Sequence, residues 1–430
     1  MASKMGRVPT KTNEDLVNKS IQQILERATK NGVSNIHIEP NNTFVLVRYR
    51  RGSSLYIANK LPKHTAEALV RQLKNLAGLD TQQTQAPQVG EATVHFNHGT
   101  YKVVIATLPV LDGERVTIRL RGHVTPRQQL ESLGLWGKSL TAVEHALAED
   151  RGLVIVGSRQ ARAAQITLAG MIQKLYSPTR KRVFIEPDET ITSLLHGIKV
   201  VYGHNYAQQL KLLSEREYGA IAISNVADHA TARQVDNMAK IDKKLLVRLP
   251  VNSVARGLIL WHQLNGHLSV SQPIVVAQIN VMGLCQYCRE SYEPSIIEQI
   301  QLTEIFKTDD IATMKQLNEL ERLAEEAGLA SNQPLSSSEE NVRQLWRAKV
   351  NGCEHCDHTG FSGDIGIFEV YKPSDHFRSQ LAANESVALL QQTAIKDGMI
   401  SLKVDALTKA LRGLIDFPTL LSISESTQQF

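Results

Sequence analysis

Residues 151–175 read RGLVIVGSRQARAAQITLAGMIQKL, and this stretch indicates the fold class of the chain. It opens with an apolar run at 153–156, which predicts a buried strand that ends at Gly157. Apolar residues then recur at the spacing of a helix, which predicts a helix over 165–176. A strand, a glycine, a loop and a helix in this order are typical of a phosphate-binding loop in an α/β sheet.

The loop after this strand lacks the residues with which a P-loop binds phosphate. That motif reads Gly, four residues, then Gly-Lys-Ser/Thr, and its small residues let backbone amides surround the phosphates. Counted from Gly157, the second glycine is replaced by Arg162. Ala163 stands in place of the lysine, and Ala164 in place of the hydroxyl residue. Taken alone, the stretch is an ordinary strand, loop and helix.

The flanking sequence repeats the alternation of strand and helix. We expect strands at 153–156, 183–185, 220–223, 245–249 and 274–277. Helical spacing of apolar residues predicts helices at 139–148, 165–176, 205–215, 231–240 and 253–264. This alternation is typical of a mostly parallel, doubly wound sheet, which we assign to an α/β domain at residues 123–284.

The rest of the chain predicts a smaller domain before this sheet and helices after it. Residues 1–122 predict an N-terminal α+β domain with glycine-marked turns, which are typical of antiparallel sheet. Its expected helices are 12–30 and 63–77, and its expected strands are 36–38, 44–50, 91–96, 101–107 and 115–120. Residues 374–430 predict a helical C-terminal region, broken at Gly398 and Gly413.

Composition and sequence pattern indicate where the protein is located and which partners it does not bind. The chain has 430 residues, 42% of them hydrophobic, and a formal net charge of +5. It contains no run of about 18 apolar residues that would predict a transmembrane helix, and its N-terminus has no apolar core of a signal peptide. We therefore expect a cytoplasmic protein. No basic stretch alternates with aromatic residues, so we expect no nucleic-acid binding.

Four cysteines form two Cys-x-x-Cys pairs, Cys285 with Cys288 and Cys353 with Cys356. In a reducing compartment such pairs indicate a metal, because four thiolates suit tetrahedral Zn²⁺. Four thiolates leave no open position, so we expect a structural zinc site in a tetracysteine region at 285–373. Four buried free cysteines are the alternative reading, and the absence of a thioredoxin-like βαβ unit disfavours a redox pair.

A long insertion separates the two cysteine pairs. The gap exceeds the ~15–20 residues of the common zinc ribbon. Within the insertion at 295–350, apolar residues at helical spacing predict a helix over 317–327. We expect the metal to hold the two ends of this insertion together.

Further motifs occur along nearly the whole chain. They are Ser34-Asn-Ile-His-Ile-Glu-Pro40, Val47-Arg-Tyr-Arg50 before Gly52, Thr107-Leu-Pro109, Gly113-Glu-Arg-Val116, Leu133-Gly-Leu135, Tyr292-x-Pro294, Gly352-Cys-x-x-Cys356-x-x-Thr-Gly360, Gly366-Ile-Phe-Glu369, Gly398-Met399, Leu402, Lys409 and Gly413. Together with the cysteine pairs, they resemble the motifs of the type II secretion and type IV pilus assembly ATPases, in which the first reads Ser-Asp-Ile-His-Ile-Glu-Pro.

This resemblance implies a RecA-like motor domain of the P-loop NTPase type behind the small N-terminal domain. It also implies a hexamer with ATP at subunit interfaces, and a partner in the inner-membrane platform of a pilus or secretion machine. Arg48 and Arg50 would then reach the nucleotide of a neighbouring subunit; alternatively, they form an exposed polar strand face. Because the chain starts almost at the small domain, we expect the additional docking domain of such motors to be missing.

Departures from the family concentrate in its catalytic motifs. The family's Glu-Asp-Pro box reads Glu186-Pro187-Asp188, so only the glutamate keeps its place. In the Walker B region, Ile223-Ser-Asn-Val-Ala-Asp228, Asn225 replaces the acidic residue. The two histidine positions of the His box are Lys243 and Pro250.

These losses lead to the hypothesis of a non-catalytic family member, a pseudo-ATPase. Its degenerate catalytic positions are Ala163, Ala164, Glu186 and Asn225. Its vestigial nucleotide site would comprise Gly157, Ser158, Arg159, Arg162, Arg48 and Arg50. The same losses argue against bound ATP and Mg²⁺, whereas Zn²⁺ is expected.

Two readings of the partners and the activity follow from the resemblance. A non-catalytic member would join a ring of its own copies or of an active paralogous motor. It would then lie at the inner face of the cytoplasmic membrane only through partners. The alternative is a divergent but active assembly ATPase, in which Arg159 and Arg162 supply new phosphate contacts, because the guanidinium fork suits phosphate.

Overall fold

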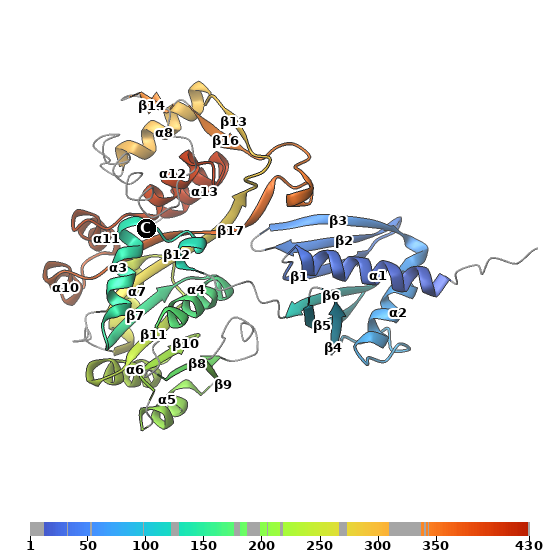
Figure 1. The fold of residues 1–430 in the computed structure, drawn as a ribbon, viewed down its shortest axis with the longest axis horizontal. Helices are drawn as coiled ribbons and strands as arrows, with labels where there is room; N and C mark the ends of the chain where they lie inside the picture. Colours follow the sequence, from blue (N-terminus) through green and yellow to red (C-terminus); the bar gives the residue numbers. More distant parts are fainter. Residues whose placement is uncertain are drawn as a thin grey trace, which may run out of the picture. The chain divides into compact units, whose positions relative to one another are not determined.

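The computed structural model describes residues 13–31, 33–51, 54–97, 99–121, 129–175, 181–186, 198–203, 205–215, 218–265, 273–308, 337–338, 341–342 and 344–428. The chain forms two compact units, Met1–His123 and Val124–Phe430 (Figure 1). Among the described residues, no helix combines the length and the apolar character that a membrane span requires.

The first unit is a six-stranded antiparallel sheet with two helices (Figure 1). The strand order is β3-β2-β1-β6-β5-β4. The strands are β1 (Asn35–Pro40), β2 (Phe44–Arg51), β3 (Ser54–Pro62), β4 (Gln88–Phe96), β5 (Gly99–Val110) and β6 (Gly113–Arg121). The helices are α1 (Asn13–Lys30) and α2 (Ala66–Leu76), and a 3₁₀ turn, η1 (Lys63–Thr65), precedes α2. The predicted α+β fold of this region is confirmed.

Alternation of apolar and polar residues explains which face of this sheet the helices cover. Ile36 and Ile38 of β1 are buried in one core with Val47 of β2 and with the apolar residues of α1 and α2. The residues between them point the other way, because successive side chains of a strand alternate between faces. His37 and Arg48, which are paired across β1 and β2, therefore lie on the opposite face.

The second unit is built on a seven-stranded sheet in the order β17-β12-β7-β11-β10-β8-β9. The strands are β7 (Gly152–Gly157), β8 (Arg182–Glu186), β9 (Lys199–Tyr202), β10 (Ala220–Ile223), β11 (Lys244–Leu249), β12 (Ile274–Leu284) and β17 (Phe361–Tyr371). All neighbours are parallel except β17, which pairs antiparallel with β12. The predicted mostly parallel α/β fold is confirmed.

Helices cover both faces of this sheet (Figure 1). A core on one face includes residues of α3 (Gly137–Ala148) and α4 (Ala161–Lys174). A core on the other face includes residues of α5 (Tyr206–Ser214), α6 (His229–Ile241) and α7 (Val254–Asn265). Strand residues alternate between the two cores, with Ile155 of β7 in one and Val154 in the other. The central strands are therefore mostly apolar, as the sequence pattern indicates, although β11 carries Lys244 and Arg248.

The structure departs from the sequence expectations at several elements of this unit, and strand β12 runs to Leu284 instead of ending at residue 277. Helix α4 begins at Ala161 rather than at 165, because Ala161, Ala163 and Ala164 favour a helix even though they leave no apolar periodicity. Strands β9 and β17 were not predicted. We assigned the residues of β17 to the tetracysteine region, whereas they complete the large sheet.

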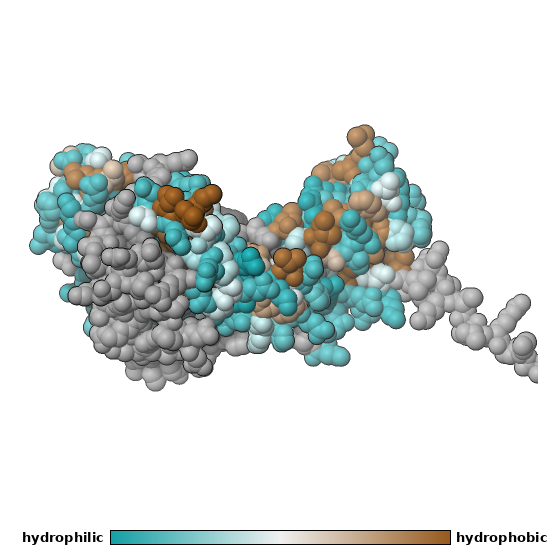
Figure 2. All heavy atoms as spheres, turned by 90° about the horizontal axis from the view of Figure 1, so that it is seen from above, coloured by the Kyte–Doolittle hydropathy of each residue, from teal (hydrophilic) through white to brown (hydrophobic). Residues whose placement is uncertain are grey.

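Short elements follow β12. They are β13 (Glu290–Tyr292), α8 (Ile296–Thr308), β14 (Ser337–Ser338), β15 (Asn341–Val342), β16 (Leu345–Arg347) and the 3₁₀ turn η4 (Glu354–Cys356). Exposed Ile296, Ile297 and Ile300 lie on α8, and Figure 2 shows a compact apolar patch on a largely hydrophilic surface. The helix predicted over 317–327 lies outside the described residues.

The C-terminal region is helical, as predicted. It comprises α10 (Asp375–Ala382), α11 (Val387–Lys396), α12 (Leu402–Leu411) and α13 (Phe417–Gln428). Gly398 and Gly413 follow the ends of α11 and α12 with φ values of 95° and 66°. This left-handed conformation ends a helix and favours glycine, which explains the two predicted breaks.

Candidate functional site

The carboxyl ends of β7, β10 and β11 form the edge of the sheet at which α/β proteins bind ligands. The strands are neighbours in the order β7-β11-β10, and they end at Gly157, Leu249 and Ile223. Ser158 directly follows the end of β7, and Asn225 lies two residues after the end of β10, so the structure brings both to one edge. Glu186 ends β8 on the far side of β10 and is fully buried.

The loop Ser158–Gln160 makes its polar contacts to the protein itself. The Ser158 amide donates to the Leu249 carbonyl over 3.0 Å, and the Gln160 amide donates to Ser158 Oγ over 3.1 Å. The Gln160 side chain binds the backbone of Asn280 twice: its Nε2 donates over 3.0 Å and its Oε1 accepts over 2.7 Å. Only three residues separate β7 from α4, so the loop is short and fastened to two neighbouring strands.

Gly157, the one glycine of the motif that remains, has a packing role. A Cβ atom at this position would lie 3.0 Å from the Val251 carbonyl oxygen and 3.2 Å from Val251 Cγ2. A glycine therefore suits the close approach of the strand end to Val251, whether or not a phosphate binds nearby.

The replaced P-loop positions lie in the first turn of α4. Ala164 is fully buried in the core beneath the helix, and its amide donates to the Gln160 carbonyl over 3.2 Å. Ala163 is half-buried, while Arg159 and Arg162 are exposed. Neither alanine carries an amine or a hydroxyl group that binds a phosphate or a metal ion.

Arg248 of β11 is the site residue that the sequence reasoning missed. It is 8% exposed, and its Nη2 donates to the Ser158 carbonyl over 3.1 Å. Its Nη1 donates to Asn225 Oδ1 over 3.2 Å. Burial lowers the pKa of the guanidinium. The signal in the sequence was an arginine among the apolar residues of the strand KLLVRL.

Two further positions of the family motifs are described by the structure, and one of them caps a helix. Asp228 caps α6, since its carboxylate accepts from the Thr231 amide over 2.8 Å and from Thr231 Oγ1 over 2.7 Å. Burial alone would raise the pKa of Asp228, but these donors lower it. Lys243 precedes β11 and lies at the amino end of the strand, away from the loop. Pro187 and Asp188 lie outside the described residues.

Arg48 and Arg50 belong to the first unit, on the sheet face opposite to its core. Arg48 forms an ion pair with Glu39, and Arg115 binds the other oxygen of that carboxylate over 2.5 Å. Burial and the neighbouring Arg115 lower the pKa of His37 on the same face. The described first unit thus presents an arginine-rich strand face in which one carboxylate is shared between two cations.

The four cysteines form one cluster in the second unit. Their sulfur atoms all lie within 4.8 Å of one another. Cys285 and Cys353 are 3.8 Å apart, Cys288 and Cys356 are 3.7 Å apart, and Cys353 and Cys356 are 3.8 Å apart. Tetrahedral ligation with Zn–S bonds of ~2.3 Å places sulfur atoms about 3.8 Å apart, so this cluster has the size of a zinc site.

The strand pair β12–β17 explains why cysteines so distant in sequence meet. Leu284 pairs with Phe361 at one end of the ladder, and the Cys285 amide donates to the Gly360 carbonyl over 2.9 Å. Burial raises the pKa of the Cys285 thiol. Burial acts the same way on Cys356, but amide donors from Cys353 and Gly360 outweigh it and lower that pKa to about 6. These amide donors favour the thiolate of Cys356, which is the form that binds metal.

A family model described as Type II/IV secretion system protein matches residues 10–422. This chain belongs to that family. The match extends over both compact units, so the resemblance inferred from the motifs is confirmed.

The relatives of this chain are distant from it in sequence. The type IV pilus assembly ATPase PilB of Thermus thermophilus is 22% identical over 96% of this chain and 44% of its own length. The protein transport protein HofB homolog of Escherichia coli K12 is 27% identical over 95% of this chain and 81% of its own length. The chain therefore spans less than half of the first relative and most of the second.

Solved structures show the same fold. The ATPase DotB of Legionella pneumophila has a TM-score of 0.63 at 14% identity, covering 98% of both chains. The pilus retraction motor PilT with bound ADP has a TM-score of 0.51 at 12% identity, covering 95% of this chain and 98% of its own. At such identities the likeness concerns the fold alone.

Proposed function

We propose that this secretion-family protein is a non-catalytic member, a pseudo-ATPase that serves as a structural or regulatory subunit in pilus assembly or type II secretion. The observation that carries the proposal is that the loop Ser158–Gln160 is hydrogen-bonded to the protein itself and has no P-loop lysine or hydroxyl residue after it. Its polar groups bind Leu249, Asn280 and Arg248, and the residues that would bind phosphate in a P-loop are absent.

Phosphoryl transfer needs a phosphate cradle, ligands for Mg²⁺, a group that orients water, and a cation near the developing charge. Ala163 supplies no cation and Ala164 no hydroxyl for Mg²⁺. The amide of Asn225 cannot accept a proton as a carboxylate does, and its Oδ1 already accepts from Arg248. Several parts of the reaction centre are thus missing together, which supports a role without hydrolysis.

The retained fold supports a role in assembly. Relatives are named for type IV pilus assembly and type II secretion, and we propose that this chain joins a ring with an intact paralogous motor, or with its own copies, on an inner-membrane platform protein. Co-expression with an intact family member from the same genome tests this. Native mass spectrometry should then find mixed rings, and exclusive recovery of separate assemblies of the two chains would contradict the mixed ring.

A divergent active ATPase remains the competing function. It requires nucleotide affinity, because a ligand that binds only the folded state raises the melting temperature. For the non-catalytic protein we expect the melting temperature to be unchanged by ADP or by a non-hydrolysable ATP analogue with Mg²⁺. A rise that disappears in an Arg159→Ala/Arg162→Ala double variant would support the active alternative.

We also propose that Cys285, Cys288, Cys353 and Cys356 hold one structural Zn²⁺. The separations of 3.7–3.8 Å between sulfur atoms support this reading, as does the choice of four thiolates, which leaves no position for a substrate. Bound zinc would fasten the ends of β12 and β17 and close the insertion between the cysteine pairs.

A further inference from the structure

Arg248 joins two loops that lie at the vestigial nucleotide site. Its two terminal nitrogens reach the Ser158 carbonyl, in the loop after β7, and Asn225 Oδ1, in the loop after β10. A planar guanidinium with donors in a fixed fork suits such a bridge, whereas a lysine ammonium acts as a point charge on a flexible stem. The bridge therefore depends on the chemistry of arginine and not on its charge alone.

The charge of Arg248 has no acidic counterpart in the described part of the chain. Both of its hydrogen-bond acceptors are neutral, and its Nε has no hydrogen-bond partner among the described residues. Burying an unpaired cation is costly, so a cation at this position calls for a local reason. In P-loop NTPases, Mg²⁺ is held by the Ser/Thr of the phosphate loop and by an Asp of Walker B, and here Arg248 contacts the equivalents of both elements.

We infer that Arg248 acts as a built-in clamp. Its guanidinium joins the remnant phosphate loop to the loop after β10, and it takes the place of the Mg²⁺ that lies between these two elements in P-loop NTPases. Arg248 is thus a positioning residue that fixes Ser158 and Asn225 without nucleotide. The Gln160 side chain fastens the same loop to Asn280 on β12, so the loop is held from two strands. The inference deepens the proposed function, because it names what holds the site in place of a nucleotide.

Hydrogen exchange of the full chain without nucleotide tests the clamp. In an Arg248→Lys variant, peptides covering 153–161 and 224–228 should exchange about tenfold faster or more, because charge-assisted hydrogen bonds to both loops are weakened. Arg248→Met, which keeps the aliphatic stem, should have the same local effect. Arg182→Lys is the matched control, since Arg182 also binds two carbonyls, Ile172 and Gln173, over 3.1 Å each; it should leave both peptides unchanged.

Unchanged exchange at both peptides in Arg248→Lys would overturn the clamp. So would protection of 153–161 by ADP with Mg²⁺ that disappears in Arg248→Lys, because Arg248 would then be a phosphate ligand. The two proposals fail separately. A wild-type chain that hydrolyses ATP but needs Arg248 for loop protection in the absence of nucleotide would contradict the pseudo-ATPase and leave the clamp standing.

Discussion

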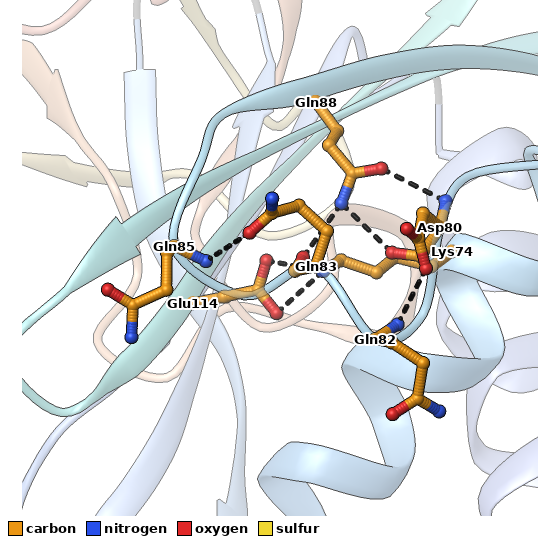
Figure 3. Close-up of polar contacts among 7 residues, drawn as sticks. All are labelled: Lys74, Asp80, Gln82, Gln83, Gln85, Gln88 and Glu114. Carbon is orange, nitrogen blue, oxygen red and sulfur yellow. Dashed lines mark hydrogen bonds and ion pairs between the residues drawn. The ribbon is translucent and has the colours of Figure 1, made fainter.

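Lys74 and Glu114 form a buried ion pair in the first unit. Figure 3 shows the Lys74 ammonium between the Glu114 carboxylate and the backbone of the loop that carries Gln83 and Gln85. Its Nζ lies 2.6 Å from Glu114 Oε1 and 2.6 Å from the Gln83 carbonyl. The two side chains are only 1% and 7% exposed. This ion pair therefore links α2, the loop after it and β6.

Lys74→Met should destabilise the first unit by about 3–5 kcal/mol, because it leaves the Glu114 carboxylate buried without its cation. Hydrogen exchange at the β6 amides of the full chain measures this loss locally. Lys63→Met, an exposed lysine at the neighbouring turn, serves as the control and should change the free energy by no more than about 0.5 kcal/mol. Equal changes in the free energy of unfolding for the two substitutions would show that the ion pair does not stabilise the first unit.

Glu369 is a buried carboxyl group without a cationic partner in the described residues. Its oxygens accept from the Val254 amide and from Gln391 Nε2, and burial raises its pKa to about 7. The unfolded chain releases this proton near the ordinary pKa of ~4.3. Between these two values the folded chain binds more protons, so stability should fall as the pH rises through that window.

Glu369→Gln should remove this pH dependence. The wild type should lose stability between pH 4.5 and pH 8, whereas the variant should not. The free energy of unfolding of the variant minus that of the wild type should therefore increase by up to about 3 kcal/mol over this range. Urea denaturation across that range provides the measurement. A difference that stays constant with pH would show that Glu369 titrates at its ordinary value.

At the residue scale, the sequence shows which P-loop residues are missing, but it does not show which residue makes new contacts in their place. The loss of a lysine at Ala163 and of a hydroxyl group at Ala164 is evident from spacing alone. Arg248 is not, because its role depends on Ser158 and Asn225, which become its neighbours only when β7, β11 and β10 align. A lone arginine in an apolar strand gives no indication of which backbone carbonyl it binds.

At the scale of elements, two helix ends allow a matched comparison of glycines. Gly413 follows α12, and a Cβ atom there would lie 2.5 Å from the Trp346 ring, while one at Gly398 after α11 would meet nothing within 4 Å. Arg289 stacks on Trp346 with its guanidinium carbon 4.5 Å from the ring centroid, and it donates to the Gly413 carbonyl over 2.6 Å. Only Gly413 is therefore needed for close packing as well as for its φ angle.

Gly398→Ala should cost about 1–2 kcal/mol for the left-handed backbone alone. Gly413→Ala should cost a further ~1–3 kcal/mol, because the Trp346 ring must move. Denaturation of the full chain gives both values, and the emission of Trp346 should shift only in the second variant. Indistinguishable costs would mean that the ring moves freely and that packing at this helix end is loose.

The cysteine cluster links two strand ends and predicts the effect of metal removal. Purified protein should contain about one zinc per chain, and chelation should accelerate hydrogen exchange at 281–285 and 360–364, where β12 and β17 meet. Cys356→Ser should lose the metal. His355→Ala should retain the metal, because the four cysteines already complete its coordination. His355 lies between Cys353 and Cys356, and its ring stacks on Tyr287 with ring centroids 4.1 Å apart. Retained metal in Cys356→Ser, or unchanged exchange after chelation, would rule out the structural role.

Elements with strong local patterns were predictable, and elements defined by distant partners were not. The strands at 220–223 and 244–249 are fully apolar or nearly so, and periodicity identified both within a residue. Strand β17 carries Gly363 and Gly366 and alternates weakly, so its place beside β12 follows from tertiary pairing. The two cysteine pairs were recognisable from spacing, but the reason they meet is that same strand pairing.

At the scale of the whole molecule, the chain has the fold of its family, and we propose that its reaction centre is degenerate. The two cores on the faces of the seven-stranded sheet are intact, and the C-terminal helices pack into cores with it. We propose that selection for assembly alone would preserve these cores, while the lysine, the hydroxyl residue and the acidic residue of the catalytic motifs are replaced by Ala163, Ala164 and Asn225.

The most direct test of the central claim is steady-state phosphate release by the purified full chain with ATP and Mg²⁺. We predict release no faster than in an Asn225→Ala variant, and no faster than in buffer without protein. Turnover by the wild-type chain that disappears in Asn225→Ala or Arg162→Ala would contradict the account, because the degenerate site would then be a working one.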